Sequence, residues 1–256
     1  MEKEGEQMND LKARLHRHEA LVGTVMGIMH PDVAEILALV GFDYLWIDLE
    51  HGPGDFAAAQ MMIQGAGGRC PCLIRVPENR DVWIKKALDT GADGVVIPQV
   101  NSAEEARRAV AACKYPPEGT RGAGVGRAHD YGMALSDYLE RANRTVAVIA
   151  QIEHIDAVDN VGEILAVPGI DCLFVGPLDL SGSLGLLGQM SHPEVQAATA
   201  IVVTRAQAAG MPLGLFVPDG YAAQAAAGRG FNLIAMSTDG IYLWTAARAA
   251  LTAARA

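Results

Sequence analysis

The sequence has few basic residues, few cysteines and no long apolar run, and each of these absences excludes a class of protein. Acidic residues outnumber basic ones by 30 to 20, so the chain lacks the basic excess that nucleic-acid phosphates require. Four cysteines in 256 residues are too few for a disulfide framework and are typical of reduced thiols in a cytoplasm. No apolar run approaches the roughly 20 residues of a membrane-spanning helix, and the charged N-terminus has no signal-peptide core. We therefore expect a cytoplasmic protein that binds neither nucleic acid nor membrane.

What the chain does contain is enough apolar material for a large core, with 50% hydrophobic and 20% charged residues. Short β-branched runs alternate with alanine-rich stretches whose apolar residues favour helical spacing. Several of the runs are continuously apolar, as in a parallel sheet covered on both faces. Strands are expected at residues 22–26, 44–48, 72–76, 94–98, 146–152, 172–175, 212–216 and 232–236. Helices are expected at residues 32–40, 56–67, 81–90, 103–113, 155–166, 193–209, 221–227 and 240–251.

Eight strand–helix units without a break in composition predict an α/β fold, a single (β/α)8 TIM barrel. The alternative is a doubly wound open sheet, which usually begins with a glycine-rich phosphate turn that residues 26–32 do not form. We place the barrel domain at residues 21–256, after an N-terminal extension of residues 1–20. Residues 115–144 form a longer insertion, and loops of such length are usually functional or interfacial.

Polar side chains gather at one end of the predicted barrel. Active sites of TIM barrels lie at the C-terminal ends of the strands. In this sequence the opposite strand ends are mostly apolar or turn residues, whereas four strands end in charged or amide side chains. The polar residues are Asp48, Glu50 and His51 after the second strand, Arg75 on the third, Gln151 and Glu153 on the fifth, and Asp179 after the sixth.

This set of side chains suits metal-assisted carbanion chemistry. Glu153 and Asp179 offer hard oxygen ligands for Mg²⁺ or a similar ion, which a 2-oxo acid can chelate while its enolate forms. Arg75 would add positive charge beside the oxyanion, and His51 could move a proton near neutral pH. Taken singly, each residue also has a structural interpretation, as a helix N-cap, an ion-pair partner or a surface residue. Their placement on one rim favours the catalytic interpretation.

A Schiff-base mechanism requires a lysine at a strand end. The lysines of this chain lie in the N-terminal segment, within one helix or where a helix ends: Lys3, Lys12, Lys85, Lys86 and Lys114. Residues 217–223 and 236–243, which follow the last two strands, also lack the glycine-rich phosphate cup common on barrels. We therefore expect an unphosphorylated acid substrate and no Schiff base.

Six segments carry a resemblance to a known family. They are GFDYLWIDLEHGP, LIRVPE, IKKALDTGADGVVIPQV, YPPEGTRG, AQIE and LFVGPLDLSGSLG. In type and order they resemble the HpcH/HpaI family of metal-dependent class II pyruvate aldolases, which includes 4-hydroxy-2-oxoheptanedioate and 2-dehydro-3-deoxyglucarate aldolases. The resemblance runs from about residue 21 to residue 251 and implies a TIM barrel of the phosphoenolpyruvate/pyruvate-domain type.

The resemblance also implies a role for individual residues. It makes His51 the general base, Asp89 the acid that pairs with it, and Arg75 the group that stabilises the enolate. Leu178 stands where many relatives have alanine, which leaves a backbone contact intact but changes the pocket. The remaining roles are Glu153 and Asp179 as metal ligands, Gln151 as a substrate-binding amide, the backbone of Leu178 and Asp179 as the pyruvyl carboxylate site, and Asp48 as an acid that reaches the metal through water.

The function expected from this resemblance is reversible aldol cleavage of a 4-hydroxy-2-oxo acid to pyruvate and an aldehyde, with Mg²⁺, Mn²⁺ or Co²⁺ as cofactor. The same residues would serve an oxaloacetate decarboxylase or a related enolate-forming lyase, which is the second hypothesis. A third hypothesis is a non-catalytic barrel that acts in assembly or ligand binding. The resemblance further implies a homo-hexamer, a trimer of dimers, in which the C-terminal helix is exchanged between partners. Apolar residues of the last stretch suit such packing: Ile241, Leu243, Trp244 and Leu251.

Overall fold

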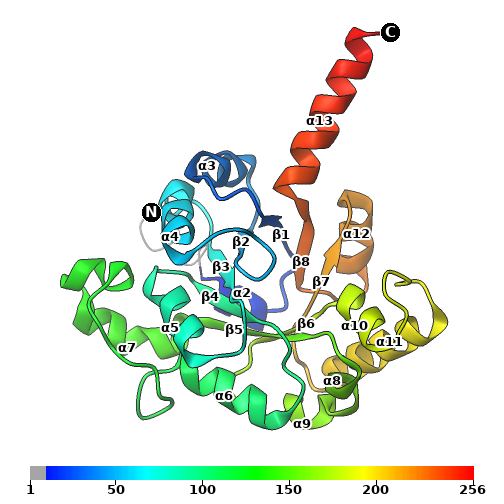
Figure 1. The fold of residues 1–256 in the computed structure, drawn as a ribbon. Coiled ribbons are helices and arrows are strands. Elements are labelled where there is room, and N and C mark those ends of the chain that lie inside the picture. The colour runs from blue at the N-terminus through cyan, green and yellow to red at the C-terminus, as the bar shows by residue number, and fades with distance from the viewer. Residues whose placement is uncertain (1–9) are drawn as a thin grey trace.

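A computed structural model describes residues 10–256, so residues 1–9 of the expected extension lie outside the described part. Eight parallel strands close into a barrel in chain order, and β8 pairs with β1 (Figure 1). The predicted TIM barrel is therefore confirmed, and the closure rules out the open sheet. Each expected strand overlaps an observed one. The strands are β1 (Leu21–Met26), β2 (Tyr44–Asp48), β3 (Cys72–Arg75), β4 (Gly94–Ile97), β5 (Ala147–Ile152), β6 (Cys172–Val175), β7 (Leu213–Val217) and β8 (Leu233–Thr238).

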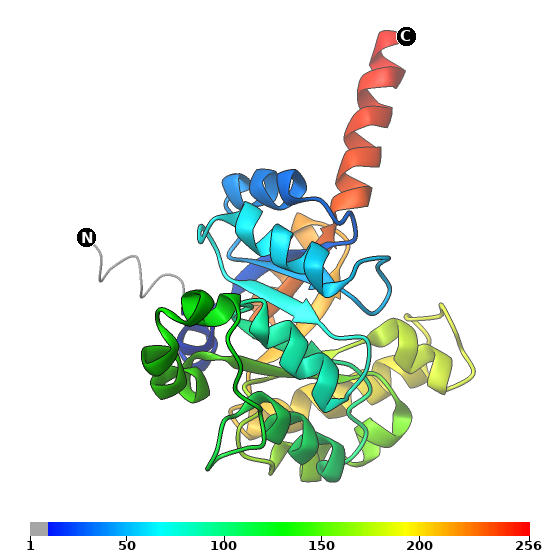
Figure 2. The same cartoon turned by 60° about the vertical axis from the view of Figure 1, so that its left-hand side comes forward.

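Helices surround the barrel in both views (Figures 1 and 2). Those expected from the sequence are α3 (Pro31–Val40), α4 (Phe56–Ala66), α5 (Asp81–Asp89), α6 (Ala103–Cys113), α11 (Pro193–Ala208), α12 (Gly220–Gly228) and α13 (Asp239–Ala254). The helix expected at residues 155–166 is instead two, α8 (Ile155–Asp159) and α9 (Val161–Leu165). Asn160 breaks it, because its backbone leaves the helical region while its side chain donates to the carbonyl of Asn101.

The sequence patterns did not predict four further elements. The insertion at residues 115–144 contains a short 3₁₀ helix, η1 (Arg127–Gly132), and most of α7 (Leu135–Thr145). A seven-residue helix, α10 (Pro177–Ser183), follows β6. The fourth, α2 (Leu11–His16), precedes the barrel. Three of them, η1, α10 and α2, have only six or seven residues, which is too short for hydrophobic periodicity to identify a helix. The helix α7 is amphipathic, with Tyr138 and Ala142 buried, but it lies in the segment expected to be a long loop.

Two layers of apolar side chains hold the barrel together. Alternate residues of the strands point inward and form a small cluster, in which Trp46 meets Phe174 edge to face at a centroid distance of 4.7 Å. The other residues point outward and pack against the helices in a larger cluster. Gly214 leaves the space that Phe174 fills, since a Cβ there would lie 2.4 Å from the ring. The inward-facing cluster therefore fills the barrel interior below the C-terminal strand ends.

The helix α2 packs across the N-terminal end of the barrel. Its Leu11 and Leu15 are buried in the inward-facing cluster. Asp171 anchors the helix, with Nζ of Lys12 at 3.1 Å and Nε2 of His16 at 2.8 Å. The domain boundary at residue 20 stays a prediction, but the described part of the preceding segment contributes directly to the barrel core.

The helix α13 follows β8 and projects away from the barrel in both views (Figures 1 and 2). Large apolar side chains on it are exposed to solvent, among them Ile241, Leu243, Trp244 and Leu251. Across residues 10–256, none of the helices combines the length and apolarity that crossing a bilayer would require.

Candidate active site

The ends of β2 and β3 hold an arginine between two carboxylates. Asp48 and Arg75 are register partners, and each is the last residue of its strand. Arg75 donates from Nε to Oδ1 of Asp48 at 2.9 Å and from Nη2 to Oδ2 at 2.6 Å. Its third nitrogen, Nη1, lies 3.1 Å from Oε2 of Glu50. The planar guanidinium is therefore fixed in orientation at the barrel mouth.

Asp48 is held as an anion. Burial by itself would raise the pKa of its carboxyl, but the hydrogen bonds and charge of Arg75 lower that pKa below its ordinary value. The backbone N–H groups of Glu50 and His51 also lower it, donating to Oδ1 over 3.1 and 3.4 Å. Asp48 thus orients Arg75 and fixes the start of the loop that carries His51.

His51 lies at the open side of this pair. Its side chain is 62% exposed, and Nε2 is 3.7 Å from Oε2 of Glu50. An exposed imidazole at the rim can meet a substrate that enters from solvent and can accept or donate a proton there.

Across the mouth, Glu153 follows directly after β5 and is buried among polar groups. Oε1 accepts the backbone N–H of Gln99 at 2.9 Å, and Oε2 accepts the side-chain amide of Gln151. A Cβ at Gly176 would lie 2.9 Å from Oε2, so glycine is needed there to leave the carboxylate room. Burial raises the pKa of Glu153 to about 7, and the nearby charges of Glu50 and Asp179 act in the same direction.

Three carboxylates, on Glu50, Glu153 and Asp179, therefore lie near enough to repel one another, and the charge of Arg75 acts on Glu50 and Glu153. Burial raises the pKa of Glu50 to about 7 as well, with added repulsion from Asp48 and Asp179. In the described part of the chain, Oε1 of Gln151 is buried without a hydrogen-bond partner, and Oε2 of Glu50 has its ion pair with Arg75 but no hydrogen bond. Carboxylates that repel one another beside the unpaired amide oxygen of Gln151 fit a hard divalent cation. Residues 10–256 contain no group of three or more His, Cys, Asp or Glu side chains that could hold a metal, so the protein would supply two carboxylates to such an ion. Glu153 and Asp179 could hold such an ion.

Leu178 and Asp179 lie in the first turn of α10, directly after Gly176 and Pro177. The first amide groups of a helix have no acceptor within it, so they can bind an anionic group. The side chain of Leu178 is 50% exposed, so it borders the open side. The structure thus brings together at one rim seven of the eight predicted site residues: Asp48, His51, Arg75, Gln151, Glu153, Leu178 and Asp179.

Asp89 is the predicted site residue that lies elsewhere. It is the last residue of α5, which returns from the end of β3 to the start of β4 and so places Asp89 at the N-terminal end of the barrel. Its Oδ1 accepts a hydrogen bond from Nη2 of Arg121 at 2.9 Å. The side chain of Arg121 is fully buried and lies over the Tyr115 ring. Within one chain, Asp89 and His51 are at opposite ends of the barrel.

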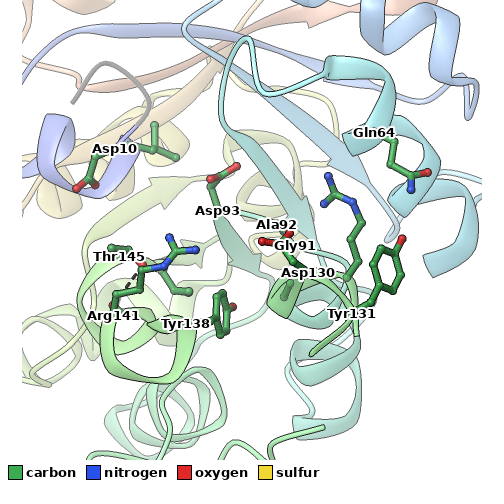
Figure 3. A pocket seen from close by; sticks show the side chains of 14 residues that line it. Asp10, Gln64, Gly91, Ala92, Asp93, Asp130, Tyr131, Tyr138, Arg141 and Thr145 are labelled. Carbon is green, nitrogen blue, oxygen red and sulfur yellow. Dashed lines mark hydrogen bonds between the residues drawn. The ribbon is translucent and has the colours of Figure 1, made fainter. Parts of the chain in front are cut away.

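A hollow of about 1050 Å³ lies near Asp89, at the end of the barrel opposite the Arg75–Glu153 site. Figure 3 shows the side chains that line it, from Asp10 beside α2 to Asp130 and Tyr131 in η1. The hollow shares no lining residue with the strand-end site.

Three residues of the mouth received no role from the sequence. Glu50 was noted at its strand end, but its contact with Arg75 depends on how the loop folds. Gln99 acts through its backbone N–H, which no side-chain pattern reveals. Phe216 is in register with Ala235 of the inward-facing cluster and is 41% exposed, so it lines the mouth from β7. Strand alternation was the signal that could have identified Phe216.

The comparisons with known proteins agree with this geometry. A family model described as HpcH/HpaI aldolase/citrate lyase matches residues 25–246. The chain is 40% identical over 255 residues to a hydroxypyruvate/pyruvate aldolase of Paraburkholderia phytofirmans, covering 96% of this chain and 98% of the relative. It is 42% identical over 213 residues to a 5-keto-4-deoxy-D-glucarate aldolase of Shigella boydii serotype 18, covering 82% of each.

A solved structure supports the same relationship. An HpcH/HpaI aldolase/citrate lyase family protein from Burkholderia cenocepacia J2315 superposes with a TM-score of 0.92 at 40% identity. That superposition covers 97% of this chain and 100% of the other.

Proposed function

The chain belongs to the HpcH/HpaI aldolase/citrate lyase family and is an aldolase-class carbon–carbon lyase, and we propose that it cleaves 4-hydroxy-2-oxo acids reversibly. The products are pyruvate and an aldehyde, and the bond that breaks joins C3 to C4. The observation that carries this proposal is the placement of Arg75 opposite the buried Glu153 and the half-buried Asp179, with an exposed His51 beside them.

Arg75 and the carboxylates form the half of the site that serves pyruvate. Glu153 and Asp179 would hold a divalent cation, Mg²⁺, Mn²⁺ or Co²⁺, which when bound would polarise the 2-oxo acid and stabilise its enolate. Arg75, oriented by Asp48, places positive charge beside the enolate oxygen. The backbone amides of Leu178 and Asp179 bind the substrate carboxylate, and Gln151 has a free carbonyl oxygen for a further contact. Asp48 would reach such a cation through water.

His51 moves the proton. It accepts the C4 hydroxyl proton while C4 becomes the aldehyde carbonyl, and the electron pair of the C3–C4 bond passes to the enolate of pyruvate. Protonation at C3 then gives pyruvate, so the overall reaction needs no oxidant or reductant. Glu50, 3.7 Å from Nε2 of His51, stabilises the protonated ring.

Asp89 joins this mechanism only from a second chain, because its own chain places it at the far end of the barrel. We therefore place the His51–Asp89 pair across a subunit interface of a homo-hexamer. The exposed apolar side chains of α13 supply a surface for such an assembly, since a lone chain would leave them in water.

Decarboxylation of oxaloacetate is the second candidate. It breaks a C–C bond to form the same enolate and requires no base, so the Arg75–Glu153–Asp179 half of the site is sufficient.

A cleavage screen tests the proposal. Purified protein is given 4-hydroxy-2-oxo acids of varied chain length and charge, with oxaloacetate in parallel and pyruvate detected as the common product. We expect pyruvate and a matching aldehyde from at least one hydroxy-oxo acid. Pyruvate and CO₂ from oxaloacetate alone would favour the decarboxylase, and no pyruvate from any substrate in the presence of divalent metal would refute both.

A further inference from the structure

A buried carboxylate outside the catalytic set lies where β8 meets α13. Asp239 is 6% exposed, and the hydrogen bonds described for it come from backbone N–H groups. Gly27 donates to both oxygens at 3.1 Å, Ile28 donates to Oδ2 at 2.8 Å, and Gly240 of its own helix donates to Oδ1 at 2.7 Å. A buried anion needs such partners. These bonds hold the loop that follows β1 against the start of α13.

That loop continues into Met29, whose side chain packs on the segment just after His51. A Cβ added to Gly54 would lie 2.6 Å from Sδ of Met29, and one added to Gly52 would lie 2.8 Å from its Cε. The thioether therefore rests on the backbone on both sides of Pro53. The loop after β1 and the loop after β2 form one packed unit with Asp239 at its base.

Asp48 fixes the start of the loop that carries His51 but holds His51 itself only weakly. The backbone N–H of His51 reaches Oδ1 of Asp48 only at 3.4 Å, and the His51 side chain is mostly in solvent. We propose that Asp239 and Met29 are positioning residues for His51: the carboxylate fixes residues 27 and 28, and Met29 transmits that position to Gly52 and Gly54. This inference rests on the proposed function, in which His51 is the base for cleavage.

The two reactions of the site distinguish positioning of His51 from general damage. Aldol cleavage requires the base, whereas oxaloacetate decarboxylation uses only the Arg75 and Glu153 half. We expect Asp239→Asn and Met29→Ala to lower kcat for cleavage by about 10- to 100-fold, because displacing a catalytic group by about 1 Å costs this much. Decarboxylation should stay within about twofold, since the enolate side is untouched. An asparagine has one acceptor oxygen and cannot replace both carboxylate oxygens.

Matched variants complete the experiment. Asp32→Asn makes the same chemical change on an exposed carboxylate of the next helix and should alter neither reaction. Met29→Leu keeps most of the packing volume and should restore cleavage relative to Met29→Ala. In a His51→Ala background, Asp239→Asn should cause no further loss, because the group that it positions is gone. If Asp239→Asn does not fold, the two Met29 variants carry the test.

The outcomes separate this inference from the proposed function. Equal losses in both reactions, or a full additional loss in the His51→Ala background, would show a merely structural role for Asp239 and overturn the inference alone. Normal cleavage in Asp239→Asn and Met29→Ala, with cleavage lost in His51→Ala, would do the same. Undiminished cleavage in His51→Ala would remove the base assignment and the inference with it.

Discussion

Glu153 receives a hydrogen bond from the backbone of Gln99, and Gln99 adopts a left-handed conformation in giving it. The N–H of Gln99 lies 2.9 Å from Oε1 of Glu153, and the φ angle of Gln99 is +53°. A side chain is disfavoured in that region because Cβ crowds the backbone. The chain thus accepts local strain at the end of β4 to hold a carboxylate of the site.

This strain predicts the order of stability of two variants. Gln99→Gly and Gln99→Ala both remove the side chain and keep the N–H group, but glycine alone adopts a positive φ freely. We expect the glycine variant to be more stable by about 1 kcal/mol in urea unfolding. An alanine variant as stable as the glycine variant would show that the backbone at this position is relaxed.

The two-point contact of Arg75 with Asp48 predicts that lysine cannot replace this arginine. Arg75→Lys keeps the charge but loses the fork that Asp48 orients. We expect kcat to fall about 100-fold in both cleavage and decarboxylation, because both pass through the enolate. Arg80→Lys, a matched change at an exposed arginine, should have no effect. A normal kcat in Arg75→Lys would mean that the guanidinium acts only as a charge.

The proposed cation site predicts a simple dependence on metal. Chelation with EDTA should abolish cleavage, and Mg²⁺, Mn²⁺ or Co²⁺ should restore it. Calorimetry should detect binding of the metal alone to the wild-type protein and lose it in Glu153→Gln and Asp179→Asn. Glu163→Gln, on an exposed carboxylate of α9, should bind as the wild type does. Full activity in a chelated, metal-free preparation would contradict the assignment.

Buried thiols predict a loss of stability in alkali. Burial raises the pKa of Cys113 to about 12 from an ordinary value of 9.0. Above pH 9 the unfolded chain therefore loses a proton that the folded chain keeps, and this group's contribution to stability falls as pH rises to 12. One proton corresponds to about 1.4 kcal/mol per pH unit.

Cys113→Ala should accordingly flatten the fall of unfolding free energy between pH 9 and 11, measured by urea denaturation at each pH. Its stability at pH 7 will be lower because of lost packing, so the slope is the quantity to compare. An unchanged slope would show that Cys113 titrates normally in the folded protein.

The sequence was sufficient to predict the barrel and the rim because both depend on local signals. Continuous apolar runs identify parallel strands, and the residue that ends each strand is read directly, as for Asp48, Arg75 and Glu153. Contacts between residues far apart in the chain leave no local pattern in the sequence. Asp239 and Gly27 are 212 residues apart, and nothing local to either indicates that one holds the other.

The direction of α5 explains why Asp89 lies at the end of the barrel opposite the other site residues. Asp89 lies in one of the segments that carry the family resemblance, but the segment alone does not indicate at which end of the barrel Asp89 is placed. That follows only from the return of α5 from the rim to the start of β4. Backbone geometry, as at Gln99, was equally hidden, because an unusual φ is imposed by the fold around the residue.

The separation of Asp89 and His51 predicts complementation between inactive chains. If the pair forms across an interface, His51→Ala and Asp89→Asn each lower cleavage to a small residual rate alone, but a mixed oligomer contains sites with both residues intact. Random mixing of two chains gives about one quarter of the wild-type sites, so activity should return toward that level after co-refolding. Light scattering should report several chains per particle, and Trp244→Glu in the exposed face of α13 should lower that mass. Mixtures as inactive as their parents, or a mass near one chain for the wild type, would confine each site to a single chain and exclude Asp89 from it.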